Sequence, residues 1–130
     1  IRGQLIIDLS GGHGGKGGNG GNGGGGSPGT RHCNGGNGAN GGIAGQGGNG
    51  GKGGVLNVTL PKPQEFRDYV LASKIVVKNT GGNAGPSGKG GYHGPAGLGP
   101  AKKNGKDGEP GPYNSSGMSG ENGSLFVQAN

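Results

Sequence analysis

The most constraining feature of this sequence is a glycine repeat with a period of three residues, first seen in GGHGGKGGNGGNGGGG from Gly11 to Gly26. Glycine fills two of every three positions, and guest residues at the third position keep one phase through Gly54. This period differs from the roughly 3.6 of an α-helix and the roughly 2 of a β-strand. It matches the left-handed polyproline-II helix, with about three residues per turn. The repeat therefore predicts helices of the polyglycine-II type.

Such a helix makes no internal hydrogen bonds, so its backbone N–H and C=O groups need partners on other segments. Glycine leaves two faces of the helix as bare backbone, which allows close backbone-to-backbone hydrogen bonding and weaker Cα–H···O contacts. Ordering each residue costs about 1–2 kcal/mol of conformational entropy. A single helix of this kind is therefore not expected to be stable, and the sequence predicts a bundle.

Composition leaves two alternatives open. Glycine accounts for 41 of 130 residues and hydrophobic residues for only 25%, a range typical of collagen-like, low-complexity or disordered chains. Disorder is the alternative that composition favours; we take the chain as ordered. The stretch GKDGEPGPY resembles collagen, but glycine at two of three positions in the first half argues against a continuous triple helix.

The glycine tracts divide into four segments. In the second half the phase of the repeat shifts between Gly97 and Gly99, beside Pro100, and we expect the chain to reverse there. The sequence SPGTRHC predicts the corresponding turn in the first half, because Ser-Pro-Gly favours turns. We expect four polyglycine-II helices, paired antiparallel, at residues 11–26, 34–54, 81–98 and 105–123.

Four short β-like runs adjoin these tracts, and we expect them to meet as a small sheet or sandwich that supplies the only hydrophobic layer. The chain reads strand, glycine tract, strand twice, so residues 1–60 and 74–130 are predicted to be pseudo-repeated halves of a single compact domain. Alternation of apolar residues predicts the buried faces. These faces comprise Leu5, Ile7 and Leu9; Leu56, Val58 and Leu60; Ile75 and Val77; and Leu125 and Val127.

The connector between the halves, residues 61–73, is predicted to hold a short helix. Pro63 is suited to the first helical position, and Phe66, Tyr69 and Val70 follow at helical spacing. A plain extended crossover is the alternative.

Charge and hydropathy exclude two classes of partner. The net charge is +6, but most lysines are scattered singly and aromatic residues make up only 4%. Nucleic-acid-binding proteins usually concentrate basic charge and interleave aromatic residues, so we expect no nucleic-acid partner. No stretch approaches the roughly 20 apolar residues of a membrane span. The chain begins at Ile1 without Met or a signal peptide, which indicates a processed protein or part of a longer one.

We find no catalytic, cofactor or metal site in the sequence, and we expect no enzyme. His32 and Cys33 are adjacent, but His13 and His93 lie elsewhere, and a metal site needs more ligands at defined spacing. The many G-x-G-x-x-G matches lack the strand and helix context of a nucleotide-binding motif. Cys33 is expected to be a buried free thiol, with an interchain disulfide as the alternative.

Three tripeptides match the N-glycosylation sequon, at Asn57, Asn114 and Asn122. Chance matches are common in a chain rich in Asn and Ser. Asn57 is the strongest candidate, because it lies opposite the Leu56/Val58/Leu60 face and should point to solvent. N-linked glycans would require a secreted eukaryotic source, and they are the only attached groups that we expect.

The glycine tracts GGHGGKGGNGG, GGNGGKGG and GNAGPSGKGG resemble polyglycine-II proteins. Similar tracts occur in snow-flea-type antifreeze proteins, in the glycine-rich adhesins of phage tail fibres and in the N-terminal domain of Obg-type GTPases. The strands beside the tracts make the Obg-like domain the closest topology, although no GTPase segment follows. In phage adhesins, variable loops contact the receptor; the equivalent loops here are SPGTRHC and LGPAKKN.

Three functions follow as hypotheses. The first is an extracellular structural module that self-assembles into fibres or arrays, through glycine faces and the edges of the terminal strands with Leu5, Ile7, Leu9, Leu125 and Val127. The second is an adhesin that binds a cell-surface receptor or glycan through Arg31, His32, Lys102 and Lys103 in its turns. The third is an ice-binding protein, in which a flat row such as Asn34, Asn37 and Asn40 orders water.

Overall fold

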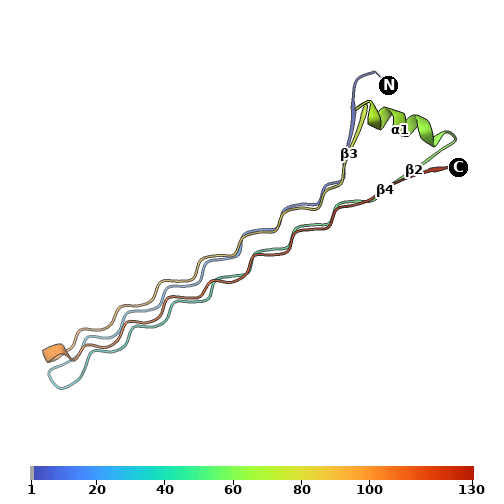
Figure 1. Ribbon diagram of the computed structural model, residues 1–130. Coiled ribbons are helices and arrows are strands. Elements are labelled where there is room, and N and C mark those ends of the chain that lie inside the picture. The colour runs from blue at the N-terminus through green and yellow to red at the C-terminus, as the bar shows by residue number, and fades with distance from the viewer. Residues whose placement is uncertain (1) are drawn as a thin grey trace. The chain divides into compact units, whose positions relative to one another are not determined.

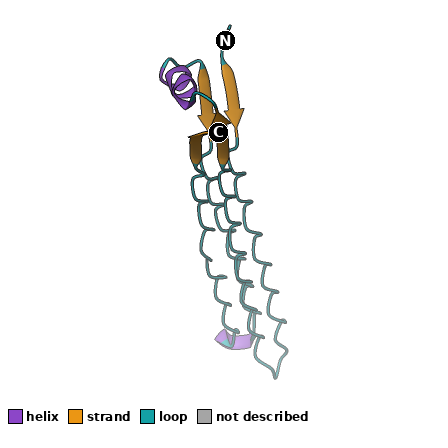
Figure 2. Ribbon diagram, turned by 90° about the vertical axis from the view of Figure 1, so that its right-hand side faces the viewer, coloured by secondary structure: helices purple, strands orange, loops and turns teal. Residues whose placement is uncertain are grey.

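The computed structural model describes residues 2–130. Contacts within the chain divide it into two compact units, each built from both halves of the sequence. Unit 1 comprises the described residues up to Gly14, Asn49–Ala84 and Met118–Asn130, and unit 2 comprises Gly15–Gly48 and Gly85–Gly117. The helix α1 (Pro63–Leu71) and the four strands belong to unit 1. Figures 1 and 2 show these elements.

The strands of unit 1 form two parallel pairs. β1 (Leu5–Asp8) pairs with β3 (Ile75–Lys78), and β2 (Leu56–Leu60) pairs with β4 (Leu125–Ala129). The small β layer of four short strands is therefore confirmed, and each pair joins a strand from one half of the sequence to a strand from the other. Parallel neighbours need long crossover connections, which the glycine-rich stretches and α1 provide here.

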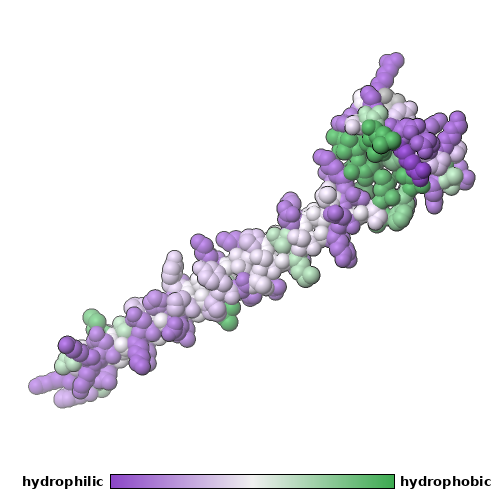
Figure 3. Space-filling view, viewed as in Figure 1, coloured by the Kyte–Doolittle hydropathy of each residue, from purple (hydrophilic) through white to green (hydrophobic). Residues whose placement is uncertain are grey.

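Helix α1 (Pro63–Leu71) confirms the helix predicted in the connector, with proline in its first turn. It contacts β2, β3 and β4, and its Phe66 ring is 8% exposed. Phe66 and Ile75 are the buried hydrophobic residues of unit 1. In Figure 3 the strongly hydrophobic surface of this unit gathers beside the helix.

The apolar faces are buried unevenly. Along β2 the alternation is as predicted, with Leu56, Val58 and Leu60 half-buried and Asn57 exposed. Ile7 and Val127 are half-buried, but Leu5 remains 46% exposed and Leu125 38% exposed. Leu9 follows β1 and is half-buried. One short helix cannot cover two separate strand pairs, so part of each predicted face stays open.

The glycine-rich segments are neither α-helix nor β-strand, and backbone hydrogen bonds join them every third residue. In unit 2, Gly17 donates to Pro86 and Gly20 donates to Lys89, so the first and third segments run parallel. Sequence-adjacent segments run antiparallel: Gly45 donates to Gly18, and the same register continues at Gly42 to Gly21 and Ala39 to Gly24.

The second and fourth segments are also parallel: in unit 2, Gly38 donates to Lys106 and Gly41 donates to Glu109. Unit 1 repeats these relations: Gly11 donates to Thr80, and Gly51 donates to Gly12. The predicted antiparallel pairing thus holds for segments adjacent in the sequence, whereas the first–third and second–fourth pairs are parallel. Two successive reversals return the chain to its starting direction, which makes alternate segments parallel.

Both reversals predicted in unit 2 are present. Thr30 and Cys33 exchange backbone hydrogen bonds at the first, and the 3-10 turn Pro100–Lys102 forms the second. Ala101 and Lys102 adopt left-handed backbone angles, with φ of 47° and 65°. These positions are uncommon for residues with a side chain, and they mark the tight change of direction before the fourth segment.

Close approach of backbones explains the glycine requirement. A Cβ added at Gly88 would lie 1.9 Å from the carbonyl oxygen of Gly18, whereas one added at Gly18 would meet nothing within 4 Å. Among the described glycines only Gly3 has a positive φ. The inner glycines are therefore needed because a neighbouring segment occupies the space of a side chain.

Candidate functional site

The four basic turn residues predicted as loop contacts lie at one end of unit 2. Gly29 donates to Leu98 at 2.7 Å, and Gly35 donates to Lys103 at 2.9 Å, so the two turns are held beside each other. The residues concerned, Arg31, His32, Lys102 and Lys103, are all exposed. The structure thus brings together two loops that are about 70 residues apart in the sequence.

Cys33 corrects one expectation: it is an exposed free cysteine, not a buried thiol. It lies at the end of the first turn, where its backbone N–H and C=O bond to Thr30. A turn of this size has no hydrophobic core in which to place a thiol.

The three histidines belong to different segments of the chain. His13 Nδ1 accepts a hydrogen bond from the backbone N–H of Asn83 at 3.0 Å in unit 1. His32 lies in the first turn of unit 2 and His93 in the third glycine segment. Among residues 2–130 no group of three or more His, Cys, Asp or Glu side chains is placed to hold a metal ion.

The side chains that sequence reasoning missed are the asparagines at guest positions. In unit 2, Asn19 Oδ1 accepts from the N–H of Lys89 at 3.0 Å, and Asn40 Oδ1 accepts from Glu109 at 2.8 Å. Acceptor and donor are 70 residues apart between the first and third segments, and 69 apart between the second and fourth. The same bond forms from Tyr92 to Asn22, from Lys106 to Asn37 and, in unit 1, from Met118 to Asn49.

Three guest residues have no side-chain atom that could accept a hydrogen bond, and the residue opposite each of them on the neighbouring segment is proline. Proline has no backbone N–H, so no donor is left without a partner at these places. Their carbonyls still take part in the backbone ladder, since Gly17 donates to Pro86. The three pairs, at the same separations of 70 or 69 residues, are Lys16 with Pro86, Gly25 with Pro95 and Ile43 with Pro112.

Three guest positions of the second segment depart from this rule. Opposite Asn34, the N–H of Lys103 is bonded to the carbonyl of Pro100 at 2.9 Å instead. The N–H of Ser115, opposite Gln46, is bonded to Asn114 Oδ1 instead. In unit 1, Lys52 and Glu121 pair through their side chains, with Nζ 3.0 Å from Oε2. Elsewhere the match of acceptor to donor, and of non-acceptor to proline, specifies one register. A slip of three residues would place asparagines opposite prolines and leave N–H groups opposite lysine.

The fourth segment supplies a second set of acceptors. Asp107 Oδ1 accepts from Ala96 at 2.7 Å, and Asn104 Oδ1 accepts from Gly99 at 2.9 Å beside the turn. In unit 1, Asn122 Oδ1 accepts from Gly81 at 3.0 Å. The third segment therefore receives side-chain acceptors from the first and the fourth segments.

The three sequon asparagines differ in their side-chain contacts. Asn57 is exposed on β2, and no side-chain hydrogen bond involves it in the described chain. Asn114 Nδ2, the atom that a glycan would modify, donates to the carbonyl of Ala44 at 3.1 Å. Asn122 is occupied as an acceptor. Asn57 remains the candidate whose amide is free.

One carboxylate of unit 1 has a shifted pKa. The backbone N–H of Ser10 bonds Asp8 Oδ1 at 3.0 Å and lowers the pKa of Asp8 below its usual 3.8. The Ser10 side chain and the charge of Lys78 act in the same direction. Asp8 is the last residue of β1, so its hydrogen bond with Ser10 lies where the strand continues into the first glycine segment.

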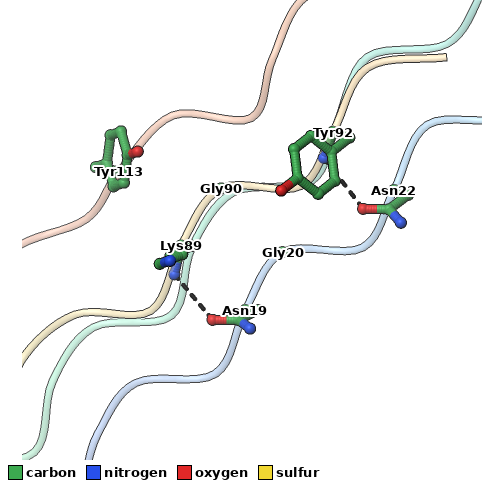
Figure 4. Close-up of a pocket in the computed structure, with 7 residues that line it drawn as sticks. All are labelled: Asn19, Gly20, Asn22, Lys89, Gly90, Tyr92 and Tyr113. Atoms are coloured by element: carbon green, nitrogen blue, oxygen red, sulfur yellow. Dashed lines mark hydrogen bonds between the residues drawn. The ribbon is translucent and has the colours of Figure 1, made fainter.

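Unit 2 also contains a hollow of about 300 Å³, lined by Asn19, Gly20, Asn22, Lys89, Gly90, Tyr92 and Tyr113 (Figure 4). It lies along the first and third segments, with Tyr113 contributed by the fourth. Both tyrosine side chains are strongly exposed, at 78% each. None of the seven lining residues is acidic.

No protein-family model matches the sequence, and the search of curated proteins gave no significant match. In residues 2–130, no helix has the length and apolar character required to cross a membrane.

Proposed function

We propose that this chain is an extracellular structural module whose glycine segments are polyglycine-II helices and whose copies assemble into fibres or arrays. The observation that carries the proposal is the ladder of backbone hydrogen bonds, in which donors recur every third residue and bond to another segment. This is the arrangement that a three-residue helix without internal hydrogen bonds requires. Hydrogen bonding between segments suits a rigid scaffold, because every segment is bonded to two or more neighbouring segments.

Two surfaces support assembly. Along the outer side of the first segment an added Cβ would meet nothing at Gly12, Gly15, Gly18, Gly21 or Gly24. Glycine is not needed there for packing within the chain, whereas a polyglycine-II segment from another copy could approach such a row closely. The strand pairs of unit 1 also have open edges, and exposed edges are templates for pairing with another chain.

Sedimentation velocity and electron microscopy over a concentration series test the proposal. We expect growing oligomers and ordered fibres or sheets in the wild type. The double variant Gly15→Gln, Gly21→Gln adds side chains where the chain has free space, so it should fold but assemble poorly. Lys16→Gln, between the two sites, is the matched control and should assemble as the wild type does. Wild-type protein that stays monomeric at every concentration would refute assembly.

The helix type is tested separately, by nuclear magnetic resonance. Dipolar couplings and chemical shifts should give φ near about −75° and ψ near about +145° along the glycine segments. Extended sheet values or averaged random-coil shifts would exclude polyglycine-II geometry whatever the oligomeric state.

A second candidate function is favoured by the convergence of the two basic turns in unit 2. Arg31, Lys102 and Lys103 are exposed, and no ion pair within residues 2–130 involves them. Such a cluster suits an acidic glycan or receptor on a cell surface. Replacing Arg31 and Lys102 by glutamine should abolish adhesion to cells while leaving the amide spectrum of the glycine segments unchanged. Adhesion that persists in this variant would exclude the turns as the binding surface.

A further inference from the structure

The hollow in unit 2 combines two aromatic rings with groups that donate hydrogen bonds. The chain has only three tyrosines and two phenylalanines, and two of these five rings line this one site. Each tyrosine side chain is 78% exposed, so neither is needed to fill a core. In Figure 4, Gly90 lies between the two tyrosines, and as a glycine it contributes only backbone to the lining.

The asparagine amides are oriented by the hydrogen bonds that they already make. Asn19 Oδ1 accepts from Lys89 at 3.0 Å, and Asn22 Oδ1 accepts from Tyr92 at 3.1 Å (Figure 4). A backbone N–H can only be met by the oxygen of an amide, so the nitrogen is directed elsewhere. Both Nδ2 groups, which no protein acceptor in the described chain engages, remain available as donors on the first segment, at the edge of the hollow.

The charge of the hollow has one sign. Lys89 is its only charged lining residue, and no ion pair in residues 2–130 involves its ammonium group. The protein as a whole carries a net charge of +6. The site therefore offers two amide donors and one cation against no carboxylate, which favours an anionic ligand rich in acceptor oxygens.

We propose that this hollow binds an acidic sugar, a uronic acid residue within a glycan. The two tyrosine rings offer apolar faces for the C–H face of a pyranose, with their hydroxyl ends in water. The Lys89 ammonium pairs with the uronate carboxylate, and the Asn19 and Asn22 amides donate to ring hydroxyl oxygens. This binding site lies apart from the basic turns and does not depend on assembly.

Titration of the ¹⁵N-labelled protein with tetragalacturonate, followed by nuclear magnetic resonance, tests this proposal. We expect shift changes at the side-chain amides of Asn19 and Asn22 and at the backbone of Gly90. Tyr92→Ala and Tyr113→Ala should each weaken binding by about three- to tenfold, the range expected for loss of one aromatic contact. Tyr69→Ala, which removes a tyrosine of helix α1 outside the hollow, is the matched control and should bind as the wild type does.

The charge requirement is tested with a neutral ligand and a second lysine. Maltotetraose, which has no carboxylate, should bind several-fold more weakly than tetragalacturonate, and Lys89→Gln should remove most of that difference. Lys16→Gln, in the first glycine segment but outside the lining, should leave the difference in place. All of these substitutions lie at exposed side chains, so we expect the variants to fold. Their amide spectra provide the check.

Three results would overturn the proposal. The first is that tetragalacturonate causes no shift at Asn19, Asn22 or Gly90 at millimolar concentration. The second is that the shifts occur but are unaffected by both tyrosine substitutions. The third is that a single-stranded oligonucleotide such as (dT)₈ binds the hollow more tightly than tetragalacturonate does, since bases also stack on tyrosine.

Discussion

The claim that inner glycines are required for close approach can be tested within a single contact. Gly88 and Gly18 face each other in unit 2, but only a Cβ on Gly88 would meet a neighbouring atom, 1.9 Å away at the Gly18 oxygen. Real Cβ atoms essentially never approach closer than 3.0 Å. The variant Gly88→Ala must therefore separate the first and third segments by about 1.1 Å, whereas Gly18→Ala needs no movement.

This separation has a calculable cost. The hydrogen bonds flanking the contact, from Gly17 to Pro86 and from Gly20 to Lys89, are 2.9 and 2.8 Å long. Lengthened by about 1 Å, both exceed the roughly 3.2 Å limit of a normal N–H···O bond. Losing two bonds of about 0.5–1.5 kcal/mol each gives about 1–3 kcal/mol of destabilisation.

The comparison of the two variants isolates this cost. Replacing glycine by alanine also restricts the unfolded chain, which stabilises a protein by about 0.4–1 kcal/mol where the fold tolerates the change. This contribution is common to both variants and cancels in their difference. We expect Gly18→Ala to be as stable as the wild type or slightly more stable. Gly88→Ala should be less stable than Gly18→Ala by about 1–3 kcal/mol.

Urea denaturation followed by tyrosine fluorescence measures the free energies of unfolding, with amide hydrogen exchange at Gly17 and Gly20 as a local readout. Exchange at both amides should become faster in Gly88→Ala and stay unchanged in Gly18→Ala. Equal stabilities of the two variants, or the reverse order, would show that close contact does not explain the inner glycines.

Three further predictions concern the side-chain acceptors and Asp8. Asn40→Ala should lower the free energy of unfolding by about 1 kcal/mol and speed amide exchange at Glu109, whereas Asn40→Asp keeps the acceptor and should lower it less. Pro86→Ala creates an N–H opposite Lys16; adding Lys16→Asn supplies an acceptor and should restore stability, as a double-mutant cycle will show. Because the folded state lowers the pKa of Asp8, the stabilising effect of its carboxylate is present above about pH 4 and is lost as the pH falls through the lowered pKa. Carbon-detected titration should give a midpoint below 3.8 for Asp8. A midpoint at or above that value would contradict the assigned bond from Ser10.

Local features of the fold were predictable from the sequence. The period of three residues marks the glycine segments, and Ser-Pro-Gly and Pro100 mark the two reversals, because turn chemistry acts over a few neighbouring residues. Pro63 and the spacing of Phe66 and Val70 predict α1 for the same reason. Alternating apolar residues predict the four strands, and the burial of β2 follows that alternation.

Which segments pair, and in which register, was not predicted from the sequence. Asn19 with Lys89 and Lys16 with Pro86 are recognisable as partners only when the offset of 70 residues is known. The signal is nevertheless present in the sequence, since prolines recur opposite guests that cannot accept a hydrogen bond. A search for matched asparagine and proline positions at a constant separation would have found the register.

What the sequence determined by itself is therefore the local conformation: where segments begin, turn and end, and that their backbones must find partners elsewhere. Only the tertiary structure decided which backbones those are, that the strand pairs are parallel, that Cys33 is exposed, and that Tyr92 and Tyr113 share a hollow. The physical reason is that these segments make no internal hydrogen bonds, and their three-residue repeat does not indicate which other segment each one bonds to. Partner choice depends on side chains that are distant in the sequence and meet only when the segments are packed.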